Sequence, residues 1–144
     1  MPIEKELEHI RHYITIQNIR YGGDRIDFIE EVDKGLLDKE ILKLLLQPII
    51  ENAVFHGVEP KIGKGLIKII GKLEGSFVRF TISDNGVGIE DLNLIEQGFG
   101  MKNVRERIEL YYGSTSEFIV KSEVNAGTTI TIRFPLNKEG HAHA

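Results

Sequence analysis

The clearest candidates for chemistry in this sequence are one acid and two glycines that follow a predicted strand. Residues 77–82 alternate aromatic or β-branched side chains with more polar ones, which indicates a half-buried β-strand that ends at Asp84. Gly86 and Gly88 allow a positive φ and let the backbone approach a flat ligand. A buried carboxylate there can accept a hydrogen bond from the exocyclic amino group of adenine, whereas it would repel the carbonyl of guanine. An ordinary tight turn capped by Asp is the alternative.

A second candidate is a polar amide beside an apolar helix face. The pattern predicts a helix that begins near Ile41 or Leu44 and ends at Gly57, with Pro48 either starting its tight part or kinking it. Asn52 flanks the apolar stripe of this helix, where an amide is costly without a partner. Its oxygen is a hard ligand that Mg²⁺ accepts when water and phosphates fill most other positions. The alternative is that the backbone supplies the hydrogen-bond partners of the Asn52 amide.

A third candidate is the pair Gly98 and Gly100, which precedes a predicted helix that extends to about Tyr112. Glycines at a helix N-terminus present bare backbone N–H groups, and these groups bind anions such as phosphate. Three basic side chains of the helix could add positive charge, although its acidic residues favour a solvated surface. The basic residues are Lys102, Arg105 and Arg107.

The rest of the chain predicts further helices and strands. Residues 3–21 repeat apolar side chains every three or four positions, which predicts an amphipathic helix. Its charged face carries His9 and His12; either could be imagined as a phosphate acceptor, but solvated histidines are expected there. Residues 89–97 are expected to form a short acidic lid. Strands are expected over residues 25–32, 66–74, 77–83, 117–123 and 128–134.

Composition restricts the class of protein. The 144 residues fit one domain with its own core, and the absence of cysteine suits a reducing compartment. The net charge is −4 and the basic residues are scattered, so nucleic acid is not an expected partner. The apolar runs are much shorter than the roughly 20 residues of a membrane span, and no signal peptide is recognisable, which predicts a cytoplasmic fragment without direct membrane contact. Residues 138–144 look like a remnant of protein expression.

These features occur in an order that resembles a known ATP-binding fold. A helix with Asn52 comes first, followed by the Asp84 turn, a short lid, the glycine pair before a helix, and a Gly-Thr pair at the last strand. This order is similar to the Bergerat-type fold of gyrase, MutL and histidine kinases. Residues 46–57 and 98–107, together with the first predicted helix, resemble the LytS/YesM class of sensor histidine kinases.

The resemblance implies an α/β fold, a two-layer α/β sandwich in which three helices cover one face of a mixed sheet of about five strands. ATP would lie between the helices and the lid. Residues 1–22 would be the end of a linker from a missing dimerisation and phosphoacceptor segment. Residues 23–137 would be the ATP-binding catalytic domain.

The resemblance also implies roles for individual residues. Asn52 would be the magnesium ligand and Asp84 the adenine anchor. Gly86 and Gly88 would form the floor of the adenine pocket, and Thr128 would help to hold Asp84 and a water molecule. Further contacts to ATP would come from Gly98 and Gly100, the phosphate cradle, and from His56, Met101, Lys102 and Asn103.

Three neighbours of Asn52 refine the expected activity. Glu51 is a candidate to orient groups or to accept a proton, with an ordinary surface glutamate as the equal alternative. Pro48 stands where the water-activating ATPases of this fold carry a glutamate, and proline cannot act as a base, so hydrolysis of ATP is expected to be slow. Phe55 stands where these kinases often carry a lysine that contacts phosphate.

The resemblance implies a two-component sensor histidine kinase that uses ATP and Mg²⁺ to phosphorylate a histidine on the upstream segment, for relay to a response regulator. Neither His9 nor His12 has the surroundings of that acceptor, so the chain alone is not expected to phosphorylate itself. The alternatives are a nucleotide-sensing module that transfers nothing, a serine kinase that acts on a partner protein, and a gyrase or MutL type of ATPase, which Pro48 disfavours.

Overall fold

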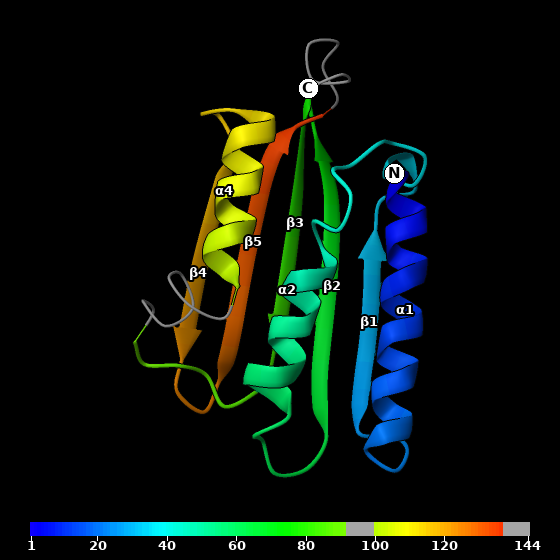
Figure 1. Ribbon diagram of the computed structural model, residues 1–144, viewed down its shortest axis with the longest axis vertical. Coiled ribbons are helices and arrows are strands. Elements are labelled where there is room, and N and C mark those ends of the chain that lie inside the picture. Colours follow the sequence, from blue (N-terminus) through cyan, green and yellow to red (C-terminus); the bar gives the residue numbers. More distant parts are fainter. Residues whose placement is uncertain (92–99, 137–144) are drawn as a thin grey trace.

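The computed structural model describes residues 1–91 and 100–136 and arranges them in two layers (Figure 1). Gly98, most of the predicted lid and the predicted remnant at residues 138–144 lie outside the described residues. The elements, in chain order, are α1 (Ile3–Arg20), β1 (Ile26–Val32), the short helix η1 (Lys34–Leu36), α2 (Gln47–Asn52), the π-helix η2 (Ala53–Val58), β2 (Gly65–Glu74), β3 (Phe77–Asp84), α4 (Met101–Tyr112), β4 (Glu117–Glu123) and β5 (Gly127–Pro135).

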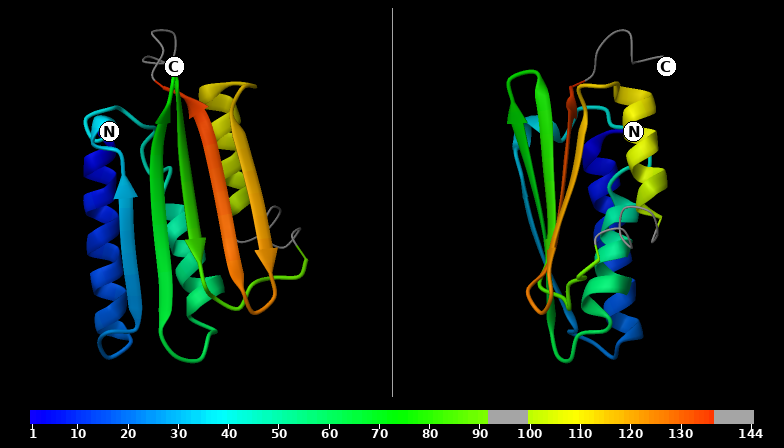
Figure 2. Two further views of the ribbon diagram at one scale, coloured as in Figure 1. Left: turned by 180° about the vertical axis from the view of Figure 1, so that it is seen from behind. Right: turned by 90° about the vertical axis from the view of Figure 1, so that its left-hand side faces the viewer.

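The strands form one mixed sheet of five strands in the order β1-β2-β3-β5-β4. The outer pair β1 and β2 is parallel, and the other neighbours are antiparallel. Seen from the side, α1, α2 and α4 lie on the same face of the sheet (Figure 2). The predicted fold class, a two-layer α/β sandwich with a mixed sheet, is confirmed. Within the described ranges, no helix has both the length and the apolar character needed to cross a bilayer.

Strand periodicity explains why Asp84 faces the helices. Along β3, alternate residues are buried from Val78 to Asp84, so the acid lies on the same face as the apolar residues before it. Along β5, the buried face includes Thr128 and Phe134, and Asp84 pairs directly with Thr128 across the two strands. Asp84 and Thr128 are therefore the last inward-facing pair between β3 and β5, and this pair is polar, whereas the other inward-facing pairs of these strands are apolar.

The helix that carries Asn52 differs from the prediction at both ends. It begins at Gln47, rather than near Ile41 or Leu44, with Pro48 in its first turn. Proline is favoured there because the first N–H groups of a helix have no intrahelical partner. The helix does not end at Gly57 either, because the π-helix η2 continues it to Val58.

The core lies between the sheet and the helices and includes a stack of aromatic rings. The ring of Phe134 lies 4.3 Å from that of Tyr112 on α4 and 6.4 Å from that of Phe80, measured between ring centroids. All three side chains are buried. The stack holds α4, and with it Gly100 at the start of that helix, against the sheet.

We expect Phe134→Ala to lower the free energy of unfolding by about 3–5 kcal/mol, because it removes a buried ring and leaves a cavity. Leu110→Ala is the matched control: Leu110 is 89% exposed on α4, and its truncation should change stability by no more than about 0.5 kcal/mol. Denaturant unfolding of the two variants measures the difference. Equal stabilities would contradict this account of the core.

Candidate functional site

Asp84 is a buried carboxylate held by backbone donors. Its side chain is 9% exposed, and Oδ1 accepts a hydrogen bond of 2.8 Å from the N–H of Gly86. Burial raises the pKa of Asp84 to about 6, although hydrogen bonds from the backbone of Gly86 and Thr128 act in the opposite direction. An ionised carboxylate accepts about four hydrogen bonds. Asp84 therefore keeps the capacity to accept a further donor.

Three glycines let neighbouring segments approach this acid. A Cβ atom at Gly57 would lie 2.6 Å from Oδ1 of Asp84, and one at Gly86 would overlap the carbonyl group of Gly57. Gly127, with a φ of +114°, places its Cα against the backbone of Asp84 in the same way. The N–H of Val87 also donates to the carbonyl of Gly57 over 3.1 Å. The end of η2, the turn after β3 and the β4–β5 hairpin thus meet around Asp84.

Gly57 was missed as a site residue because a glycine after a helical pattern has the same signature as a helix cap. The structure gives it a different role, since any side chain there would collide with Asp84. Gly88, predicted as part of the pocket floor, has a φ of +70° and lies against the backbone of Glu123. The positive φ of Gly88 agrees with the prediction. The close approach that this glycine allows is to the protein backbone at Glu123.

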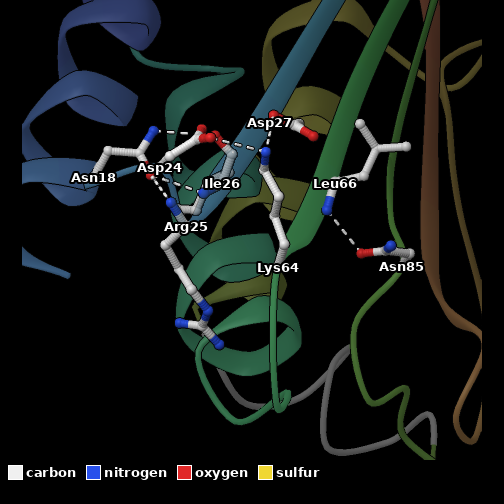
Figure 3. Close-up of polar contacts among 8 residues, drawn as sticks. All are labelled: Asn18, Asp24, Arg25, Ile26, Asp27, Lys64, Leu66 and Asn85. Carbon is white, nitrogen blue, oxygen red and sulfur yellow. Dashed lines mark hydrogen bonds and ion pairs between the residues drawn. The ribbon is translucent and has the colours of Figure 1, made fainter. Parts of the chain in front are cut away.

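Two hydroxyl groups connect the turn to the last hairpin. Thr128 is buried, and its Oγ1 lies 2.8 Å from Oγ of Ser122. Ser122 in turn accepts the N–H of Ile89 over 2.7 Å. Asn85 holds the other side of the turn, because its Oδ1 accepts the N–H of Leu66 over 2.7 Å (Figure 3). Ser122 carried no signal in the sequence, where it is an ordinary polar residue of a strand.

Asn52 is the second buried polar group of the site. Its side chain is 7% exposed, and within the described residues its buried Oδ1 accepts no hydrogen bond. A buried amide oxygen without a partner is unfavourable, and such groups in native proteins need an explanation. A hard cation such as Mg²⁺ would satisfy this oxygen.

Asn52 lies at a cavity of about 200 Å³ that is shared between α2, η2 and the start of α4. Gly100, the residue before α4, has a φ of +80°, a conformation that favours glycine. Lys102 and Asn103 follow on the exposed face of α4. The residues around the cavity are Pro48, Glu51, Asn52, Phe55, His56, Gly100 and Met101. The structure therefore brings together five of the predicted site residues, which come from α2, η2 and the start of α4.

The titratable neighbours of Asn52 have distinct environments. Burial lowers the pKa of His56, opposed by the nearby charge of Glu59, so this imidazole is mainly neutral at pH 7. Glu51 is half-buried and its Oε2 accepts a hydrogen bond of 3.2 Å from the side chain of Gln47. Arg107, one of the three basic residues of the predicted helix, donates to the carbonyl of Leu44 over 2.8 Å in an exposed contact.

One helical run connects the two polar groups. Asn52 ends α2, and Gly57, five residues later in η2, packs against Asp84. The arrangement thus has an acid suited to a purine amino group, a bare amide oxygen suited to a cation, and a glycine at the start of α4.

Comparison with known proteins agrees with this arrangement. The family described as histidine kinase-, DNA gyrase B- and HSP90-like ATPase matches residues 37–138. The chain belongs to this family, whose domain binds ATP.

The similar sequences are those of sensor histidine kinases. The chain is 36% identical over 141 residues to the sensor histidine kinase YesM of Bacillus subtilis, and 35% identical over 142 residues to the sensor histidine kinase YpdA of Escherichia coli. The alignments cover 95% and 92% of the chain but only 24% of each relative, so the chain spans about a quarter of their length. The sensor protein LytS of Oceanobacillus iheyensis is 30% identical over 85% of the chain and 23% of its own length. The predicted resemblance to this class is confirmed.

Solved structures show the same fold. The blue-light activated histidine kinase of Erythrobacter litoralis superposes with a TM-score of 0.76 at 22% identity, covering 97% of this chain and 43% of that one. The catalytic domain of the histidine kinase ThkA superposes with a TM-score of 0.64 at 23% identity and covers 90% of both chains. The second match spans nearly the whole of a catalytic domain.

We expect Gly57→Ala to destabilise the protein by about 1–3 kcal/mol, because the new methyl group overlaps the carboxylate of Asp84 and forces a backbone shift. Gly35→Ala is the matched control, since a Cβ there meets no atom within 4 Å. Chemical unfolding of both variants tests the prediction. If Gly57→Ala were as stable as Gly35→Ala, the close approach described above would be wrong.

Asp84 also predicts a pH dependence of stability. Its pKa is about 6 in the folded protein against an ordinary value of 3.8, so the folded state binds this proton more tightly. The contribution of Asp84 to stability is therefore fully present below pH 3.8 and is lost as the pH rises to about 6. Asp84→Asn removes the buried charge and should raise the free energy of unfolding at pH 7.5 by about 2–3 kcal/mol, with little gain at pH 4. Asp38→Asn, a change of an exposed acid, should show no such gain at either pH. A gain of the same size at both pH values would exclude the buried charge as its cause.

Proposed function

We propose that this chain is the ATP-binding catalytic domain of a two-component sensor histidine kinase. It would donate the γ-phosphoryl group of ATP to a histidine on an upstream dimerisation segment, for relay to a response regulator. The observation that carries the proposal is the buried, unpartnered oxygen of Asn52 at a cavity shared with Gly100 and Met101. Family membership and the relatives named as sensor histidine kinases support it. Since ATP is the substrate, the domain would work on the cytoplasmic side of the membrane.

Asp84 would select the purine. Its carboxylate is fixed by the N–H of Gly86, so it can accept the exocyclic amino group of adenine without reorganising. The carbonyl that guanine has at this position would face a buried negative charge and be repelled. Thr128 would contribute mainly through the backbone contact that helps to hold the acid, because its hydroxyl contacts Ser122.

The phosphates would lie between α2 and the start of α4. The first N–H groups of a helix have no intrahelical partner and form an anion site. In α4 these belong to Met101, Lys102 and Asn103, directly after Gly100. Gly98 would extend this phosphate cradle, and the side chains of His56 and Lys102 would add hydrogen-bond donors or charge.

Asn52 would hold Mg²⁺, the assignment that best explains its bare oxygen. When bound, the ion supplies positive charge that offsets the charge of the phosphates. Asn52 would contribute a single oxygen ligand, the others coming from phosphate and water. Catalysis by the chain itself would then consist of positioning ATP for in-line transfer to a histidine nitrogen. Glu51 would orient a neighbouring group or accept a proton, and the placement of Pro48 beside it leaves no base for hydrolysis at that position.

Nucleotide binding tests the proposal. We expect the wild-type chain to bind ATP with a requirement for Mg²⁺ and to prefer ATP over GTP. Asp84→Asn should weaken ATP binding about tenfold or more through loss of a charge-assisted hydrogen bond, and should abolish the purine preference because an amide can also donate to guanine. Asn52→Ala should remove the requirement for Mg²⁺, and Asp38→Asn should behave as wild type. Retained purine preference in Asp84→Asn would refute the adenine assignment.

Phosphoryl transfer separates the kinase from a nucleotide-sensing module. A histidine-bearing helical acceptor segment, supplied as a separate polypeptide with ATP and Mg²⁺, should acquire acid-labile phosphate. Tight ATP binding without any transfer would favour the sensing module. Acid-labile phosphate on the chain alone would contradict the proposal that the acceptor lies upstream.

A further inference from the structure

Glu6 is a fully buried acid on α1 that contacts the beginning of the helix carrying Asn52. Its Oε2 atom accepts hydrogen bonds from the N–H groups of Leu46, over 2.7 Å, and Gln47, over 3.0 Å. These two groups belong to the start of α2, where N–H groups have no partner inside the helix. A side chain 40 residues earlier in the chain therefore caps α2.

Arg25 contacts the other end of the same helical run. Its guanidinium donates to the carbonyl of Val58 over 2.8 Å and to that of Gly63 over 2.6 Å, and it also contacts the carbonyl of Lys61. The side chain of Asn18 fixes the backbone of Arg25, because its Oδ1 accepts the N–H of Arg25 over 2.9 Å (Figure 3). The turn from α1 to β1 thus places a cation at the last residues of η2.

The two charges match the electrostatics of the helical run. A helix has partial positive charge at its N-terminus and partial negative charge at its C-terminus. Glu6 lies at the first of these ends and Arg25 at the second. Because both residues belong to α1 and the turn that follows it, one continuous segment holds both ends of residues 47–58.

Glu6 is unfavourable as a mere core residue. Its second oxygen, Oε1, is buried and has no hydrogen-bond partner in the described part of the chain. Burying such an atom costs free energy that an apolar side chain would not cost. The two N–H groups that donate to Oε2 offset this cost, and they lie where the helix begins.

The loop before α2 is held from the opposite side by α4. Arg107 donates to the carbonyls of Lys43 and Leu44, and the N–H of Leu42 donates to the hydroxyl of Tyr112 over 2.9 Å. Leu44 has a φ of +56°, a strained conformation for a side chain of this size. The position of α2 is therefore defined jointly by α1 and by the helix that follows Gly100.

We propose that Glu6 and Arg25 are positioning residues for magnesium-dependent ATP binding. They hold residues 47–58 at both ends, so that the oxygen of Asn52 stays at the cavity it shares with Gly100. The inference rests on the proposed function of Asn52 as a magnesium ligand. It makes α1 part of the scaffold of the nucleotide site, although α1 precedes the residues 37–138 that the family matches.

Glu6→Gln tests the first contact, with Glu8→Gln as the matched control, since Glu8 is a partly exposed acid of α1 that forms an ion pair with Lys5 on the same helix. The Mg²⁺ concentration that gives half-maximal ATP binding should rise about five- to tenfold in Glu6→Gln. The ratio of ATP to GTP affinity should not change, because Asp84 lies on β3. Glu8→Gln should match wild type in both. If Glu6 had a merely structural role, its substitution would lower the melting temperature without changing the Mg²⁺ midpoint at 25 °C. A folded Glu6→Gln variant with an unchanged Mg²⁺ midpoint therefore overturns the proposal.

Arg25→Lys provides a second, independent variant, with Arg20→Lys as its control. Lysine keeps the charge but loses the planar fork that contacts several carbonyls. Amide hydrogen exchange over residues 49–58 should be faster in Glu6→Gln and Arg25→Lys and unchanged in both controls. If the wild-type chain shows no magnesium-dependent ATP binding, the proposed function fails and this inference fails with it, whereas wild-type binding with an unmoved Mg²⁺ midpoint in the variants overturns the inference alone. Equal exchange in the variants and controls overturns it.

Discussion

The site depends on the close approach of a helix backbone to a buried carboxylate. Gly57 lies so near Asp84 that no side chain fits between them, and the same glycine carbonyl accepts the N–H of Val87. The helical run that carries Asn52 and the turn that follows β3 are thus held in one relation to each other. A carboxylate buried in this way destabilises the domain without ligand, as its raised pKa indicates. A hydrogen bond from a purine amino group to Asp84 would offset this destabilisation.

The strand periodicity was sufficient to predict that Asp84 is buried at the end of β3, because inward-facing positions of an alternating pattern can be counted from the sequence. The burial of Asn52 could be predicted because this residue adjoins the apolar stripe of its helix. Helix boundaries were predicted less well: Gly57 has the signature of a helix cap, and its contact with Asp84 depends on tertiary packing. Pro48 marked the start of α2 but was compatible with two interpretations. The predicted boundary between residues 22 and 23 stays a prediction.

Glu6 shows why charged residues are easily overlooked. It lies between Glu4 and Glu8 in a helix with many charges, and such acids are usually solvated. Its position nevertheless falls on the apolar stripe, three residues after Ile3 and next to Leu7, and all three side chains are fully buried. Helical spacing alone could therefore have distinguished it, whereas its partners at Leu46 and Gln47 could not have been inferred from local sequence.

The winding of η2 has a consequence for how one nucleotide could reach both polar groups. In an α-helix, residues five apart point in directions that differ by about 140°. A π-helix bonds each carbonyl to the N–H five residues on, as the N–H of Glu59 does with the carbonyl of Val54 over 2.8 Å. Residues five apart, such as Asn52 and Gly57, thereby come closer to one side of the helix. The wider turn of η2 would therefore help Asn52 and Asp84 to reach the same nucleotide, one at its metal ion and the other at its adenine.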